Sequence, residues 1–337
     1  MPVGKDIIRK GLHYILAQKG ADELWSDFET LAGPATEWVS AYTLSGLAAI
    51  SEYQVSINES HKRLLSCQRK SGGWGYNHYV PPDADSTAWV LLCYATLPCW
   101  RPSALSKGLR YLLRHADQET GGFSTYISAD QIDRYIGARP EQVEGWLQPH
   151  PCVTGVALQA ILYYGHMEEA DVLAKGCDYL LRGRGEDRLW ESYWWKGRGY
   201  ATYHALKALL LMHRLGGQKL RQTLEAIADH QDKEGFWRDN CGHPDAFNTA
   251  FYCRSLALTT DSRYAGTILK GTKWLAAVQM RDGSWPSTPM LRIPVPMITE
   301  PEAITEWREN ELGTGVILAD QHRLFTSMSI LQALHYC

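Results

Sequence analysis

The chain of 337 residues has no apolar run long enough to cross a membrane, no marked excess of one charge and only six phenylalanines. A net charge of −3, with no stripe of basic residues, argues against nucleic acid as a partner. The amino terminus leads into an amphipathic segment without the long apolar core of a signal peptide. Eight cysteines include no C-x-x-C pair, which favours reduced thiols. We therefore expect a cytoplasmic protein that does not bind nucleic acid.

The few phenylalanines contrast with 13 tryptophans and 18 tyrosines, and several tryptophans recur at a nearly fixed interval. Three segments share the pattern Q-x-x-x-G-x-W, namely Gln68–Trp74, Gln231–Trp237 and Gln279–Trp285, and a weaker copy ends at Phe123. The equivalent aromatic positions are 25, 74, 123, 190, 237 and 285, separated by 49, 49, 67, 47 and 48 residues. Nearly equal steps of this size indicate six structural repeats.

Each repeat combines an amphipathic segment, the tryptophan turn and a more apolar segment, which predicts a pair of helices. A Lys-Gly pair marks four of the amphipathic segments, at Lys10, Lys107, Lys175 and Lys270. A Ser or Thr anchors each apolar segment, at Ser40, Thr87, Thr154, Thr202, Thr249 and Thr326. The terminal repeats resemble the others, although open solenoids usually end in atypical caps. We therefore predict an all-α fold, a single domain over residues 1–337 that closes into an α6/α6 barrel, or toroid.

In such a ring, the amino ends of the inner helices meet at one mouth. The residues four positions before the anchors are mostly ionisable: Thr36, Asp83, His150, Arg198, Asp245 and His322. Aspartate at a helix start is often only a cap, so capping remains an alternative for each. Two insertions, at about 124–149 and 286–321, are predicted to cover this mouth as lids, because insertions in repeat proteins collect on the binding face. The second contains five prolines and is expected to be irregular.

The segment Asp83-Ala-Asp85-Ser86-Thr87-Ala88, set beside these turns, resembles the D-x-D-D-T-A motif of the squalene–hopene cyclase and class II terpene cyclase family. The resemblance implies an α/α-barrel enzyme of natural product biosynthesis, a cyclase or isomerase whose acid protonates an alkene or epoxide. That role falls on Asp85, with Asp83 beside it, and Ser86 replaces the third aspartate. The implied substrate is a small apolar molecule of isoprenoid type. Family members usually have a second helical domain, so lids, a second copy or a partner chain would close the cavity here.

The chemistry of alkene protonation can be argued from the residues themselves. An apolar pocket and an adjacent carboxylate both raise the pKa of a carboxyl group, so Asp83 and Asp85 could share a proton. His150 is expected to donate a hydrogen bond to this pair. Aromatic faces would stabilise a carbocation. The substrate-binding candidates are Trp38, Tyr76, Trp89, Trp195, Tyr200 and Phe247. No cofactor is expected, and no D-D-x-x-D run supports a magnesium cluster.

Two other classes of function stay open. The chain also resembles, more distantly, the β-subunits of zinc-dependent protein prenyltransferases. There His150 and Cys152 would hold zinc, completed by His204 or Asp85, although a buried Cys152 could simply pack. Cys241, His243 and Asp245 form a second candidate cluster in one loop. The third reading is a non-catalytic toroid that binds a lipid or peptide.

Overall fold

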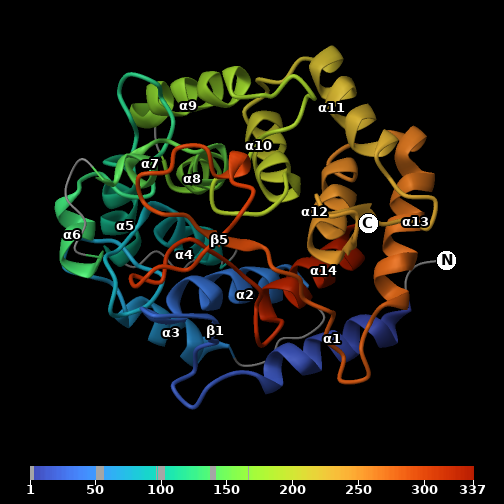
Figure 1. Ribbon diagram of the computed structural model, residues 1–337, viewed down its shortest axis with the longest axis horizontal. Helices are drawn as coiled ribbons and strands as arrows, with labels where there is room; N and C mark the ends of the chain where they lie inside the picture. The colour runs from blue at the N-terminus through green and yellow to red at the C-terminus, as the bar shows by residue number, and fades with distance from the viewer. Residues whose placement is uncertain (1–3, 51–56, 96, 98–102, 137–141, 166) are drawn as a thin grey trace.

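The computed structural model describes residues 4–50, 57–95, 97, 103–136, 142–165 and 167–337. In these parts of the chain, long helices form two concentric sets (Figure 1). The outer set is α1 (Lys5–Ala17), α3 (Asn58–Ser66), α5 (Ser103–Leu113), α9 (Ala170–Arg182), α11 (Gly217–Asp229) and α13 (Ala265–Ala277). The inner set is α2 (Glu37–Ala49), α4 (Ala84–Ala95), α8 (Pro151–Tyr164), α10 (Gly199–Leu211), α12 (Ala246–Leu256) and α14 (Leu324–Tyr336). The predicted α/α barrel is confirmed.

The ring is closed, because each inner helix packs against two inner neighbours and α14 packs against α2. Inner helices such as α8 are buried over most of their length. Outer helices such as α5 bury one stripe, which includes Leu105, Leu109 and Leu112. The predicted arrangement, with the more apolar helices inside, therefore holds.

The recurring tryptophan joins the two helices of its own repeat by hydrogen bonds. The Trp74 ring Nε1 donates to the Leu64 carbonyl at the end of α3, at 2.8 Å. Its backbone N–H donates to the Thr87 hydroxyl on α4, at 3.0 Å. The same two kinds of bond recur at Trp25, Trp190, Trp237 and Trp285. The Ser/Thr anchors are thus hydrogen-bond acceptors for the turn.

The rest of the turn fastens one repeat to the next. Gln68 Nε2 donates to the Ala104 carbonyl at the start of α5, at 2.7 Å. Gly72 has φ +104° and lies so near α5 that an added Cβ would stand 2.7 Å from the Lys107 carbonyl oxygen. Trp74 packs on Gly108, where a Cβ would stand 2.8 Å from the indole. The Lys-Gly pair is therefore the docking point for the preceding turn.

The same contacts close the ring between its first and last repeats. Gln279 Nε2 donates to the Ile7 carbonyl on α1, at 2.9 Å. The indole of Trp285 packs on Gly11, where an added Cβ would stand 2.8 Å from it. The glutamine and tryptophan of the last turn thus contact the first helix in the same way as those of the Trp74 turn contact α5.

The sixth anchor was predicted one residue too early. The Ser327 hydroxyl accepts the Trp285 N–H at 3.2 Å, whereas the Thr326 hydroxyl donates to Asp320. The residue four positions before the true anchor is therefore Arg323 rather than His322. The long insertion before α14 leaves no fixed spacing, so the sequence cannot separate two adjacent hydroxyl residues.

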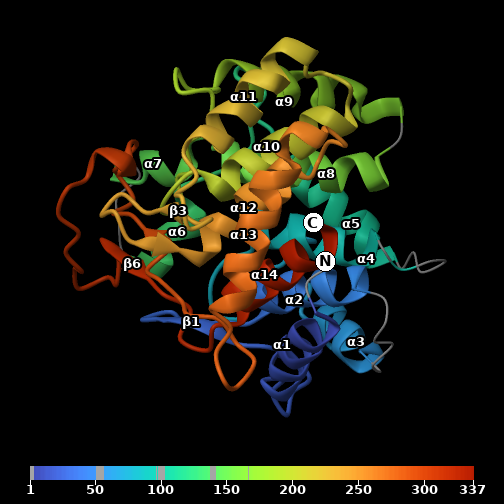
Figure 2. The same cartoon turned by 90° about the vertical axis from the view of Figure 1, so that its right-hand side faces the viewer.

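Both insertions lie at one end of the barrel, over the starts of the inner helices (Figures 1 and 2). The first carries α6 (Asp130–Ile136) and α7 (Glu144–Leu147). The second is more regular than predicted, because β5 (Leu291–Ile293) and β6 (Val316–Leu318) pair antiparallel around the 3₁₀ turn Pro301–Ala303. Trp146 Nε1 donates to the Pro294 carbonyl at 3.0 Å and joins the two insertions.

Shorter elements complete the fold. The strands β1 (Asp27–Thr30) and β2 (Gly33–Ala35) form a hairpin at the mouth, and β3 (Trp237–Arg238) pairs with β4 (Pro244–Asp245). Two further 3₁₀ turns, η2 (Met167–Glu169) and η3 (Ser262–Tyr264), precede outer helices. In the described part of the chain, no helix has the length and apolarity needed to cross a membrane.

Candidate active site

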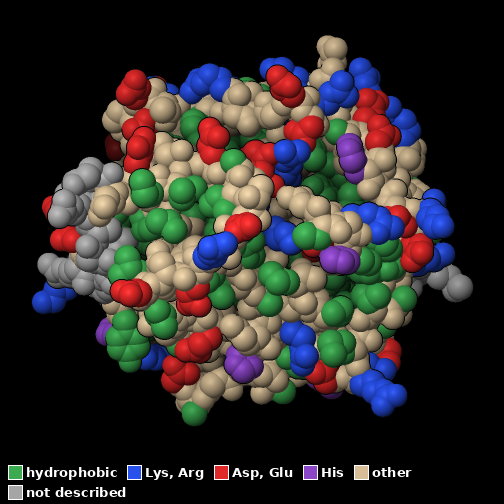
Figure 3. Space-filling view, in the orientation of Figure 1, with side chains coloured by type: hydrophobic (Ala, Val, Ile, Leu, Met, Phe, Trp, Pro, Cys, Tyr) green, Lys and Arg blue, Asp and Glu red, His purple; other side chains and the backbone are tan. Residues whose placement is uncertain are grey.

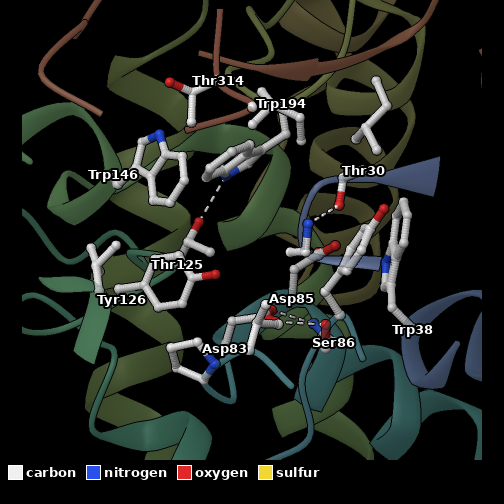
Figure 4. Close-up of a pocket in the computed structure, with 18 of the residues that line it drawn as sticks. Thr30, Trp38, Asp83, Asp85, Ser86, Thr125, Tyr126, Trp146, Trp194 and Thr314 are labelled. Atoms are coloured by element: carbon white, nitrogen blue, oxygen red, sulfur yellow. Dashed lines mark hydrogen bonds between the residues drawn. The ribbon is translucent and has the colours of Figure 1, made fainter. Parts of the chain in front are cut away.

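A cavity of about 390 Å³ lies at the mouth of the barrel, beneath the two insertions. Its floor is the first turn of α4, which carries Asp83, Asp85 and Ser86 (Figure 4). Its roof comes from the second insertion, through residues that include Ile293 and Thr314. Both insertions therefore contribute lining residues to the cavity, and their role as lids stays a prediction.

The two carboxyls on the floor have different partners. Asp83 accepts the Ser86 N–H and the Ser86 hydroxyl, each at 2.7 Å, and so caps α4. Asp85 lines the cavity, and its Oδ1 is buried without a hydrogen-bond partner among the described residues. Ser86, which replaces the family's third aspartate, thus donates both of its hydrogen bonds to Asp83 and none to Asp85 Oδ1.

Burial raises the pKa of both carboxyls. For Asp83, burial outweighs the two bonds from Ser86 and raises the pKa to about 7. For Asp85, burial and then the neighbouring Asp83 carboxylate raise the pKa well above its usual range, while Trp38 opposes the rise. The pair therefore keeps its proton on Asp85 when Asp83 ionises.

Two aromatic walls rise on either side of this floor (Figure 4). On one side, Trp38 stacks on Tyr76 with ring centroids 6.2 Å apart and contacts Trp195 at 5.7 Å. On the other, Trp146 stacks on Tyr126 at 5.9 Å and contacts Trp194 at 5.4 Å. Aromatic faces attract a cation by about 0.5–2 kcal/mol each, so the walls favour positive charge between them.

Three of the predicted substrate-binding residues lie behind the cavity wall. Trp195 stacks on Tyr200 at 4.6 Å and on Phe247 at 5.0 Å. Trp89 Nε1 donates to the Tyr200 hydroxyl at 2.9 Å. Trp38, Tyr76 and Trp195 line the cavity, whereas Trp89, Tyr200 and Phe247 do not. The role of these last three in substrate binding stays a prediction, with Tyr200 and Phe247 stacked behind the Trp195 ring.

His150 is also placed differently from the prediction. Its Nε2 donates to the Gly145 carbonyl at 2.9 Å, and its ring stacks on Tyr193 at 3.8 Å, outside the cavity lining. Burial lowers the pKa of His150 to about 3, so the ring is neutral. The hydrogen bond that the structure shows for His150 therefore goes to Gly145, and the predicted bond to the acid pair is not among the described contacts.

The proposed zinc ligands are not brought together. In the described residues, no group of three or more His, Cys, Asp and Glu side chains is arranged to hold a metal ion. His204 Nδ1 bonds to Gln159 Nε2 at 3.1 Å, and Cys152 is a buried thiol whose pKa is raised by burial. Asp245 accepts the Asn248 N–H at 2.9 Å and caps α12, so capping explains this residue.

Several lining residues were not predicted as site residues. The insertions supply Thr125, Tyr126, Trp146, Glu311 and Thr314. The apolar and aromatic composition of the insertions was the signal available in the sequence. This composition indicates that the insertions pack over the mouth of the barrel, but it does not show which of their side chains point into the cavity.

The fold and the site define an α/α-barrel protein with a carboxyl pair at the floor of an apolar, aromatic cavity. The family model of the squalene–hopene cyclase C-terminal domain matches residues 66–288. The chain belongs to this family.

Curated relatives include the squalene–hopene cyclases of Zymomonas mobilis subsp. mobilis (27% identical over 248 residues) and Bradyrhizobium diazoefficiens (22% over 239 residues). Each match covers 64% of this chain and 36% of the relative. The chain thus spans about a third of the length of these relatives.

Solved structures match over nearly the whole chain. A protein from Actinoplanes is 27% identical, with a TM-score of 0.86 over 98% of both chains. A variant of the type II terpene cyclase MstE from Scytonema, in complex with its product merosterolic acid A, is 25% identical, with a TM-score of 0.85 over 98% of this chain and 95% of that one. A one-ring barrel of this size therefore has solved counterparts.

Proposed function

We propose that the protein is a class II terpene cyclase that cyclises an isoprenoid after protonating it at a carbon–carbon double bond or an epoxide. The observation that carries the proposal is the Asp85 carboxyl, which lines the cavity between two aromatic walls with its Oδ1 buried and without a hydrogen-bond partner among the described residues. Burial and the Asp83 carboxylate raise its pKa, which favours the protonated acid. The MstE structures in complex with a geranylgeranyl dihydroxybenzoate substrate and with a product support the class of reaction and an apolar isoprenoid substrate. A cytoplasmic location and action without a cofactor belong to the same proposal.

The proposed reaction has three steps. The Asp85 proton moves to one alkene carbon, the π electron pair forms the new C–H bond, and Asp85 becomes a carboxylate. The cation formed is attacked by further double bonds, and it is held between Trp38, Tyr76, Trp146 and Trp194. Loss of a proton to a base or addition of water ends the sequence. The insertions limit the access of water, which would otherwise trap the cation early.

Replacing Asp85 tests this function. Asp85→Asn is expected to lower turnover of a polyprenyl substrate at least about hundredfold, the range typical of a removed general acid, with helical content unchanged by circular dichroism. Turnover is measured by product analysis. Near-normal turnover in this variant would remove Asp85 from the role. A wild-type protein that binds isoprenoids and forms no product would instead support the non-catalytic toroid.

A further inference from the structure

The lining of the cavity contains carboxyl groups and, among the described residues, no basic side chain. Among the lining residues that the structure describes, the ionisable acids are Asp83 and Asp85 at the floor and Glu311 at the mouth, and none is Lys, Arg or His. The other described lining residues are aliphatic, aromatic or hydroxyl-bearing, such as Thr30 and Thr125. In space-filling view, hydrophobic side chains gather between charged ones on this face (Figure 3).

Glu311 is carried on a fixed turn. The Asn310 N–H donates to the Thr314 carbonyl at 3.0 Å, and Asn310 Oδ1 accepts the N–H groups of Leu312 and Thr314. Gly313 has φ +71°, and an added Cβ there would stand 2.9 Å from Leu31 on the β1–β2 hairpin. The turn that carries Glu311 is thus held by its own hydrogen bonds and by its contact with the β1–β2 hairpin.

The surrounding part of the second insertion adds further acid. Residues 300–312 contain five glutamates and one arginine, Arg308. Arg308 forms an ion pair with Glu306 at 2.7 Å, and the buried Arg292 pairs with Glu302. The two basic side chains described in this insertion, Arg292 and Arg308, are therefore already paired with carboxylates.

We propose that the substrate is an isoprenoid whose polar end is uncharged and donates a hydrogen bond, as an alcohol or phenol does, rather than a diphosphate or a carboxylate. The proposal rests on the function proposed above. An anionic end would enter a poorly solvated cavity that offers it carboxylates and no described cation. A hydroxyl end near the mouth would instead donate to the Glu311 carboxylate, and such charge-assisted bonds are stronger than neutral ones. The same acidic field favours the cationic intermediates.

Ligands of matched chain length test the proposal. In the Asp85→Asn background, which blocks turnover, binding of geranylgeraniol and of geranylgeranyl diphosphate is followed by quenching of the fluorescence of the cavity tryptophans. Geranylgeraniol is expected to bind with a Kd about tenfold or more below that of the diphosphate. Adding Glu311→Arg should reduce this preference about tenfold or reverse it. Adding Glu168→Arg, the same charge change at an exposed residue outside the cavity lining, should leave it unchanged.

The outcomes separate this proposal from the proposed function. Equal or tighter binding of the diphosphate, or binding of neither ligand, overturns the proposal that the polar end of the substrate is uncharged. A preference that Glu311→Arg changes no more than Glu168→Arg overturns the role of Glu311. Asp85-dependent cyclisation of a diphosphate by the wild-type protein would contradict the substrate class while leaving the acid mechanism intact.

Discussion

Asp83 and Asp85 lie two residues apart at the start of α4, and their surroundings favour the proton on Asp85 over Asp83. Ser86 gives Asp83 two hydrogen bonds, which favour its charged form. Asp85 has no such donor at Oδ1, and it lies beside the Asp83 charge. At the residue scale, Ser86 favours the charged form of Asp83, while burial and then the Asp83 carboxylate keep the proton on Asp85 as the acid.

This division predicts the pH profile of the enzyme. Because Asp85 must be protonated to act and its pKa is raised, kcat/KM should be level on the acid side and fall as the pH rises through that raised pKa. Asp83→Asn removes the anion that is the second cause of the rise, so the pKa of Asp85 falls. The alkaline decline should then begin at a lower pH. The measurement is kcat/KM against pH for both proteins.

A matched control comes from α12, where Asp245 caps the helix as Asp83 caps α4. Asp245 accepts the Asn248 N–H and the Asn248 side-chain amide, and it does not line the cavity. Asp245→Asn should leave the pH at which kcat/KM declines unchanged. If this pH does not change in Asp83→Asn, or if it changes equally in both variants, the coupling of Asp83 to Asp85 is contradicted.

The acid pair could be predicted from the sequence because a short motif fixes both residues on one helix turn. The role of His150 could not. Its position four residues before Thr154 places it at the mouth, but its ring turns toward Gly145 and Tyr193, which come from an insertion and from a later turn. Trp89, Tyr200 and Phe247 show the same limit. They lie on inner helices, but Tyr200 and Phe247 stack on the far side of Trp195, and Trp89 bonds to Tyr200 rather than lining the cavity.

At the scale of elements, the tryptophan turn depends on the absence of a side chain on the next outer helix. Trp74 occupies the space above Gly108 in α5, where an added Cβ would stand 2.8 Å from the indole. Gly108→Ala should therefore destabilise the protein by about 1–3 kcal/mol, as overpacking usually does. Urea denaturation measures the change in the free energy of unfolding.

The control for this variant is Gly266→Ala in α13, where an added Cβ meets nothing within 4 Å. There the alanine should be neutral or stabilising by up to about 1 kcal/mol, since it restricts the unfolded chain and favours helix. Similar effects of the two substitutions would mean that the turn does not need the close approach.

The helices could be predicted from the sequence because the turn recurs at a nearly constant step, apart from the step that contains the first insertion, and a Lys-Gly pair marks four of the repeats. The insertions could not be predicted in the same detail, because nothing repeats within them. The β5–β6 pairing, the bond between Trp146 and Pro294, and the choice of Ser327 over Thr326 all arise from contacts between segments far apart in the chain. Several of the lining residues that were missed, such as Tyr126, Trp146 and Glu311, come from the insertions.

At the scale of the whole molecule, the ring and its two insertions form the cavity from one chain. Trp146 joins the first insertion to the second, and Tyr193 donates to the Ile298 carbonyl at 2.7 Å, which joins the second insertion to the barrel. The roof over the carboxyl pair therefore comes from within this chain. A second copy or a partner chain over the mouth remains a prediction.

A closed ring has no terminal repeat, so its joining contact should matter as much as an interior one. Gln279 bonds to Gly283 and to Ile7 of the first helix, and Gln231 bonds to Gly235 and to Thr267 of the next helix, all at 2.9 Å. Gln279→Ala and Gln231→Ala each remove two hydrogen bonds and should each destabilise the protein by about 1–3 kcal/mol, in a single urea transition. In an open stack, Gln279→Ala would instead release α1 alone. Hydrogen exchange that rises only in α1 for Gln279→Ala, with an unchanged midpoint of global unfolding, would contradict closure of the ring.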